Sequence, residues 1–330
     1  MIYPDNPILT FLGRGGFVES VHRGAWVATR ASGDIISGVG DPQQLIFPRS
    51  ASKSLQAIPL IESGAADAFG FGGQEIALAL ASHNGEAQHL EVVARMLAAA
   101  GLDERHLLCG PQAPRVGDLN QPATRLLNNC SGKHAGFLAT AVHRGLDPKS
   151  YLDPKGELQK EIHLAVEELA GTPELTSAID GCGAPTFRLP LASLATAIAR
   201  LTSPADLAPE RQRACRRITA AGAAYPDLVG GIKGRIDSDI MRVTSGRIFA
   251  KIGAEGVFVV GAVEGDVGLA IKVDDGNERG FDYYLISLLK ALDLVSADEF
   301  ERLTPWNDSQ LRNWDGFVVG EETLTPFPDL

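Results

Sequence analysis

The stretch FPRSASKSLQ, residues 47–56, holds a serine and a lysine three positions apart, Ser50 and Lys53. Apolar residues follow at helical spacing, so residues 50–64 are predicted to form a helix. Positions i and i+3 share one face of a helix, and the hydroxyl and the amine are therefore expected to face one cleft. An uncharged lysine can take the proton of such a serine, provided that burial or a nearby cation such as Arg49 lowers its pKa.

The spacing alone is a weak signal, because Ser287 and Lys290 repeat it in an apolar run that is typical of an ordinary core helix. A serine that caps a helix, followed by a solvated lysine, gives the same pattern. Four further motifs downstream distinguish the first match from the second.

Composition bounds the class of protein. The chain has 330 residues, of which 45% are hydrophobic, and we expect it to form a single catalytic unit over residues 1–330. A net charge of −11 without a basic block disfavours nucleic acid or an anionic membrane as partner. No apolar run reaches about 18 residues, so no membrane span is expected. The four cysteines do not suggest a disulfide framework, and the N-terminal residues lack a secretory pattern. Both observations indicate a cytoplasmic protein.

Strand patterns at both ends, with helical patterns between them, predict an α/β fold with α+β layering. Residues 17–30 and 34–44 alternate as a hairpin, and residues 247–273 as a three-stranded antiparallel meander. Hairpin and meander are expected to join one antiparallel sheet, with the helices packed against it. The tail after Trp306 is predicted to be a loop. Helices are predicted at residues 74–80, 88–100, 128–145, 154–170, 192–199, 208–221 and 281–294.

The second motif, ASHNGE at residues 81–86, places a hydroxyl, an imidazole and an amide at the end of an apolar run. Ser82 is a candidate second nucleophile or proton relay, and His83 and Asn84 are candidates for binding substrate. The alternatives are a turn or a helix cap for Ser82 and Asn84, and a structural hydrogen bond for His83.

Two glycine-flanked turns carry cysteines, NNCSGKH at residues 128–134 and DGCG at residues 180–183. Cys130 and Lys133 are spaced to face one point, and Cys130 with Cys182 could form half of a zinc site. Buried, inert thiols are the alternative. A lysine ligand must lose its proton, which a thiolate-bound metal nearby would favour.

The last motif, AKIGAEG at residues 250–256, places Lys251 on a predicted strand from which it can project into a cleft. A strand lysine paired with an upstream Ser-x-x-Lys helix resembles the active sites of penicillin-recognising serine hydrolases. Lys272, on the next strand, competes for this role, and an edge-strand charge is the alternative interpretation of Lys251.

The five motifs FPRSASKSLQ, ASHNGE, NNCSGKHAGFLA, DGCGAPTF and AKIGAEGV, taken in order, resemble the bacterial class 3 L-asparaginases of the Rhizobium etli type. The resemblance covers residues 11 to 275. It implies a fold similar to that of serine β-lactamases and glutaminases, a homodimer with separate active sites, and hydrolysis of L-asparagine to L-aspartate and ammonia. It also implies two Ser–Lys tandems, Ser50 with Lys53 and Ser82 with Lys251.

The same resemblance implies zinc beside the catalytic serines, bound by Cys130, Lys133 and Cys182. Asparagine is a zwitterion, and Arg49 and Asp180 are the candidates for its α-carboxylate and its α-ammonium group. Residues in matching motifs that are expected to orient substrate or metal are Arg49, His134 and Asp180.

Three other functions remain open. A glutaminase or another small-amide amidohydrolase would use the same residues, because one methylene in a pocket is worth only about 1–3 kcal/mol. A penicillin-binding or β-lactamase-like enzyme is normally exported, which the N-terminal sequence disfavours. A zinc-binding protein without catalytic activity is the alternative from another class.

Overall fold

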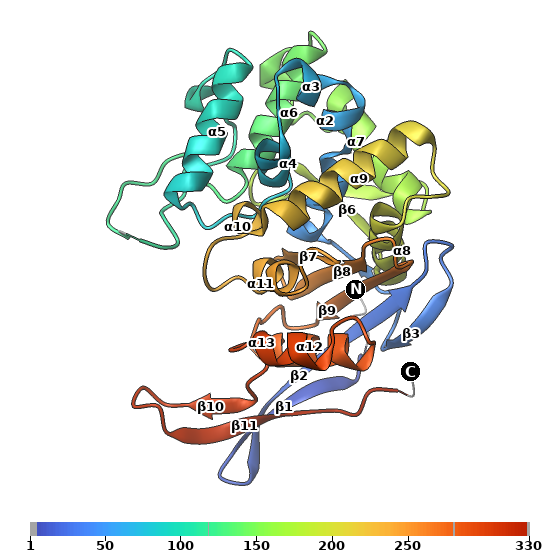
Figure 1. Ribbon diagram of the computed structural model, residues 1–330, viewed down its shortest axis with the longest axis vertical. Helices are drawn as coiled ribbons and strands as arrows, with labels where there is room; N and C mark the ends of the chain where they lie inside the picture. The colour runs from blue at the N-terminus through green and yellow to red at the C-terminus, as the bar shows by residue number, and fades with distance from the viewer. Residues whose placement is uncertain (1–4, 118, 280, 329–330) are drawn as a thin grey trace.

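The computed structural model describes residues 5–117, 119–279 and 281–328 (Figure 1). Its main sheet is antiparallel, with the order β10-β11-β1-β2-β9-β8-β7 and with β3 paired to β2. Its strands are β1 (Ile8–Arg14), β2 (Phe17–Thr29), β3 (Ile35–Val39), β7 (Ile248–Gly253), β8 (Val257–Ala262), β9 (Val267–Val273), β10 (Gln310–Arg312) and β11 (Val318–Leu324). A small sheet contains β4 (Leu45–Ile46), β6 (Pro185–Pro190) and β5 (Thr176–Ile179).

The predicted hairpin and meander are confirmed, and β2 pairs with β9 to join them in one sheet. The fold class, α/β with α+β layering, is therefore confirmed as well. Strand β8 reads VFVVGA without polar alternation, and nearly all of it is buried. A continuous apolar strand of this kind is stable only where both faces of the sheet are covered.

Helices cover both faces. Helix α8 (Leu191–Thr202) packs on β2, β8 and β9. At α12 (Asp282–Ala291), Trp26 Nε1 donates to the Tyr284 hydroxyl at 2.9 Å, and the rings of Phe258 and Phe281 lie 5.7 Å apart. Figure 1 shows α2 to α9 grouped on one side of the sheet, with α12 and α13 on the other.

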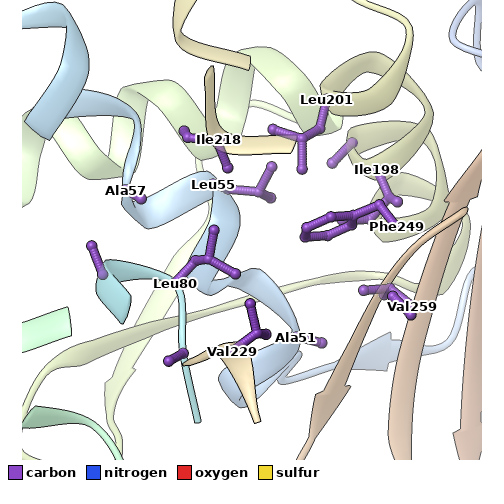
Figure 2. Packing of buried hydrophobic residues seen from close by; sticks show 14 of the residues in the cluster. Ala51, Leu55, Ala57, Leu80, Ile198, Leu201, Ile218, Val229, Phe249 and Val259 are labelled. Carbon is purple, nitrogen blue, oxygen red and sulfur yellow. The ribbon is translucent and has the colours of Figure 1, made fainter. Parts of the chain in front are cut away.

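Most of the other helices form the layer that carries the FPRSASKSLQ segment, whereas α13 lies with α12 on the opposite side of the sheet. These other helices are α1 (Lys53–Gln56), α2 (Ile58–Glu62), α3 (Ala65–Ala68), α4 (Gly73–Ala79), α5 (Ala87–Ala99), α6 (Ser131–His143), α7 (Glu157–Ala170), α9 (Pro209–Ala224), α10 (Pro226–Val229), α11 (Ile236–Val243) and α13 (Ala297–Arg302). Leu55 of α1 shares one buried cluster with Ile218 of α9 and Phe249 of β7 (Figure 2). Burying each such side chain stabilises the fold by about 1.5–3 kcal/mol, which fixes α1 against the sheet. No helix in the described residues is both long and apolar enough to cross a membrane.

Two expectations about local structure are wrong. The tail after Trp306 is not a loop, because it forms β10 and β11, and β11 pairs with β1. Much of β11 is only partly buried, so it lacks the apolar alternation that would reveal a strand. The run 50–64 is not one helix either: a 3₁₀ turn (Arg49–Ser52) precedes α1, and the chain breaks at Ala57, just before Pro59.

We predict that Gly268→Ala destabilises the protein. A Cβ at this position of β9 would lie 2.1 Å from the Ala195 carbonyl oxygen and 2.5 Å from the Ala199 nitrogen, both on the backbone of α8. Overpacking of this kind typically costs about 1–3 kcal/mol. Urea unfolding measures the change, and Gly110→Ala, where a Cβ would meet no atom within 4 Å, is the control. Equal midpoints for both variants would contradict the packing described.

Candidate active site

A cavity of about 290 Å³ lies where the FPRSASKSLQ turn, the ASHNGE segment and the end of β7 meet. Ser50 and Ser82 both line it, as does the backbone of Gly253. A larger hollow, of about 760 Å³, lies between the β1–β2 hairpin and β11, but its walls contain no serine, lysine or cysteine. The smaller cavity is therefore the candidate active site.

Ser50 sits in the 3₁₀ turn directly after a strained residue. Arg49 has a φ of 52°, in the left-handed region, which costs a non-glycine residue roughly 1–2 kcal/mol. Arg49 Nε donates to Asp180 Oδ1 at 2.7 Å, which holds the turn in place. Among the described residues, the Ser50 hydroxyl has no hydrogen-bond partner, and it remains available to a ligand in the cavity.

The end of β7 presses on this turn from the other side. A Cβ on Gly253 would lie 2.5 Å from the Pro48 carbonyl oxygen and 3.2 Å from the Ala51 nitrogen. Only glycine allows so close an approach of strand and turn. The glycine of the AKIGAEG motif thus brings the Lys251 strand to the candidate nucleophile.

Lys53 is fully buried and contacts the second serine rather than the first. Its Nζ donates to the Ala81 carbonyl oxygen at 2.7 Å, to Ser82 Oγ at 3.0 Å and to Cys130 Sγ at 3.1 Å. Burial lowers the pKa of the Lys53 amine, and the charge of Lys133 adds to this effect. The Ser50–Lys53 pair expected from the spacing is not hydrogen-bonded, because the long lysine side chain reaches to residues 81–82.

Lys251 is also buried, but the expected contact with Ser82 is not formed. Lys251 Nζ lies 3.4 Å from Asp237 Oδ2 and donates to the Ile252 carbonyl oxygen at 3.1 Å. Burial lowers the pKa of Lys251 to about 7. The competing residue, Lys272, donates to the Glu255 carbonyl oxygen at 2.7 Å and does not line the cavity.

Sequence reasoning missed Arg235 and Asp237, which brace this part of the site. The guanidinium binds both Asp237 oxygens, at 3.2 and 3.0 Å, and also donates to the Ser82 carbonyl oxygen. Burial opposes ionisation of Asp237, but the charges of Arg235 and Lys251 outweigh it and lower the pKa of Asp237 to about 2. An acidic residue in the first turn of α11, in the segment RIDSD, was the available signal.

The two cysteine motifs come together beneath the serines. Lys53 Nζ lies 3.1 Å from Cys130 Sγ and Lys133 Nζ lies 3.2 Å from Cys182 Sγ. Interaction with the Cys182 thiol, helped by the charges of Lys53 and Lys133, lowers the pKa of Cys130 far below the usual thiol value. Burial raises the pKa of the two remaining thiols to about 12, as is typical of core cysteines; they are Cys109 and Cys215.

The donor chemistry of this cluster suits zinc, which favours thiolate sulfur and nitrogen ligands. In the described residues, no group of three or more histidine, cysteine, aspartate and glutamate side chains is placed to hold a metal ion. A metal bound by Cys130 and Cys182 would therefore need Lys133 as its third protein ligand, as the resemblance implies.

The histidines of the motifs lie in the core. His83 Nδ1 accepts from the Gly85 N–H at 3.2 Å, so its Nε2 donates to Ser131 Oγ at 3.0 Å. Burial lowers the pKa of His83 far below its usual value, and the structural interpretation of this residue fits best. His134 Nδ1 bonds the Tyr151 hydroxyl at 2.7 Å. Neither histidine lines the cavity, whereas Asn84 does.

Arg49 and Asp180, the expected ligands of a zwitterion, bind each other instead, and neither lines the cavity. Their ion pair ties the DGCG turn to the turn of Ser50. It therefore fixes the position of the cysteine cluster relative to the candidate nucleophile.

Comparison with known proteins identifies the family. Among solved structures, Mglu in its native form at 4.3 M NaCl shares 17% identity, and the alignment covers 84% of this chain and 63% of Mglu, with a TM-score of 0.44. A β-lactamase from Mycobacterium bovis shares 14%, with 81% and 94% covered and a TM-score of 0.41. The comparison with curated proteins found no match. The family model of L-asparaginase II matches residues 11–324, nearly the whole sequence, and the chain therefore belongs to the L-asparaginase II family.

Proposed function

We propose that the protein hydrolyses the side-chain amide of L-asparagine to L-aspartate and ammonia. The observation that carries the proposal is a buried lysine amine bonded to one serine, with a second, unbonded serine hydroxyl lining the same small cavity. Membership of the L-asparaginase II family supports amide hydrolysis. The four catalytic residues are Ser50, Lys53, Ser82 and Lys251.

In this mechanism Ser50 attacks the amide carbonyl carbon and forms an acyl-enzyme. Its proton passes through the Ser82 hydroxyl to the uncharged Lys53 amine, along the 3.0 Å hydrogen bond between them. Collapse of the tetrahedral intermediate breaks the carbon–nitrogen bond, and the Lys53 proton leaves with ammonia. Water then attacks the acyl-enzyme, with the same groups taking its proton, and aspartate is released.

The developing oxyanion needs preorganised donors. Ser50 and Ala254 line the cavity, and neither backbone N–H donates a hydrogen bond to a turn or loop of the described chain. We assign them as the oxyanion donors. Arg235 also lines the cavity, and its ion pair with Asp237, which Lys251 approaches, supplies a fixed electrostatic environment there.

Zinc is proposed as the cofactor, held by Cys130, Cys182 and a deprotonated Lys133. When bound, it supplies Lewis-acid character and positive charge near the substrate. The nucleophile in this proposal is a serine, so the metal would bind and orient the substrate. On the resemblance alone, we also propose a cytoplasmic homodimer whose active sites belong to separate protomers.

Glutamine is the second candidate substrate. A cavity of about 290 Å³ exceeds what a single asparagine requires, and rejection of one methylene is worth only about 1–3 kcal/mol. Side-by-side values of kcat/KM for the two amides decide between them.

We predict that Ser50→Ala lowers ammonia release from L-asparagine by at least about a thousand-fold, because the acyl-enzyme cannot form. Ser287→Ala, in the second Ser-x-x-Lys sequence, is the matched control and retains turnover. Near-normal turnover in Ser50→Ala would remove this residue from the mechanism.

Zinc content, measured by mass spectrometry on purified protein, tests the metal site. We expect zinc in the wild type and its loss in Cys130→Ala and in Cys182→Ala, since each variant deletes a thiolate ligand. Cys215→Ala removes a buried thiol outside the cluster and should retain the metal. Zinc bound equally by all three variants would refute these ligands.

The buried Lys251 should leave a signature in the pH dependence of stability. Its pKa falls from 10.5 to about 7 on folding, so between these values the unfolded chain binds more protons and stability rises with pH. Relative to Lys251→Met, the wild-type free energy of unfolding should therefore increase from pH 7 towards pH 10. Urea titrations over this range measure it, with the exposed Lys155→Met as control; parallel curves for all three proteins would contradict the prediction.

A further inference from the structure

Three ionisable side chains line the candidate active site without a protein partner. Arg115, Glu278 and Asp282 all border the 290 Å³ cavity that contains Ser50. Within residues 5–117, 119–279 and 281–328, none of their side chains forms an ion pair or a hydrogen bond. Charged groups at the wall of a cavity that are left unpaired by the protein are suited to pair with a ligand.

The other charged groups near the site are already engaged. Arg235 is held by both oxygens of Asp237, and Arg49 by Asp180, so neither guanidinium is free to bind a small anion. Arg115 is thus the cation of the described lining that remains available. It lies on the irregular segment 107–126, whereas Glu278 and Asp282 lie between β9 and the first turn of α12.

The positions of these groups relative to one another match a particular ligand. Arg115 is close enough to Glu278 for their charges to interact, although the two do not form an ion pair. Glu278 and Asp282 line the same cavity, and burial together with the negative charges of Glu278 and Glu322 raises the pKa of Asp282 to about 7. A ligand that carries one anionic and one cationic group, only a few atoms apart, would pair with both Arg115 and the carboxylates.

We propose that Arg115 binds the α-carboxylate, and Glu278 with Asp282 the α-ammonium group, of a free amino-acid amide. This inference rests on the proposed function and adds the residues that would select a free amino acid over asparagine within a peptide or with blocked termini. An α-carbon carries its carboxylate and its ammonium group side by side, as the neighbouring Arg115 and Glu278 require. A guanidinium binds a carboxylate through two parallel hydrogen bonds, which also orients the ligand.

The arrangement also explains how the side-chain amide would reach Ser50. With both α-groups bound by Arg115 and the two carboxylates, the amide of the same molecule remains for the two serines that line the same cavity. A blocked ligand leaves Arg115 or the carboxylate pair without its partner, and unpaired polar groups of a site are a strong source of discrimination.

The test compares kcat/KM for L-asparagine, its Nα-acetyl derivative and its α-methyl ester, measured as ammonia release. For the wild type, kcat/KM should be about tenfold to a hundredfold higher for L-asparagine than for each blocked amide. This is the range expected when a charge-assisted hydrogen bond is lost. Arg115→Gln should lose the discrimination against the ester alone. The double variant Glu278→Gln, Asp282→Asn should lose only the discrimination against the acetylated amide. Arg105→Gln, an exposed arginine outside the cavity, is the control and should keep both preferences.

Binding of L-asparagine to Ser50→Ala, measured by calorimetry with and without Arg115→Gln, separates the two proposals. Wild-type protein that hydrolyses all three amides equally well would overturn the zwitterion site and leave the hydrolase standing. Variants that lose activity on all three substrates in proportion would overturn it too, because that pattern reports a structural role. Binding that is weakened by Arg115→Gln, without turnover in the wild type, would support the site and refute the hydrolysis. Neither binding nor turnover would refute both.

Discussion

The site depends on one buried amine. Lys53 is buried at the start of α1, with its Nζ held by a carbonyl oxygen, a hydroxyl and a thiol. Desolvation disfavours the charged form of such an amine and lowers the pKa of Lys53, and this is the physical basis for a lysine that can accept a proton. The cost is offset by the apolar packing of Leu55 and its neighbours, which fixes α1 and prevents water from reaching the amine.

The two serines differ in ways that separate their roles. Ser82 is buried, its hydroxyl is bonded to Lys53, and its carbonyl oxygen accepts from Arg235, so the residue is fixed at both ends. Ser50 lines the same cavity with an unbonded hydroxyl, in a turn strained at Arg49. A fixed, lysine-bonded hydroxyl suits proton transfer, and a free one at the cavity wall suits attack on a substrate. Spacing in the sequence pairs Ser50 with Lys53, whereas in the folded chain Lys53 bonds Ser82, and Ser50 shares only the cavity with this pair.

The sequence pattern predicted those elements that are stabilised by contacts between residues close to each other in the chain. Apolar runs and turn residues gave the β2–β3 hairpin, the β7–β9 meander and most helices, since these form between neighbours in the chain. The pairing of β1 with β11 joins residues more than 300 positions apart, at a half-exposed edge without clear alternation. The same difference between contacts near and far in the chain applies to the candidate site. The motifs identified Ser50, Ser82, Lys53 and both clustered cysteines, but which serine a long lysine side chain reaches depends on tertiary packing. No spacing encodes the Arg235–Asp237 pair.

The charged side chains around the cavity are of two kinds, those paired within the protein and those without a protein partner, and we infer different roles for them. Arg49 with Asp180 and Arg235 with Asp237 are ion pairs internal to the protein, and each ties one segment of the site to another or fixes a backbone oxygen. Protein-internal pairs set geometry because both partners are satisfied before any ligand arrives. Charges at the cavity wall that lack such partners cannot have that role. In the proposed site they pair with a substrate of complementary charge, while the paired charges keep the serines and the lysine in place.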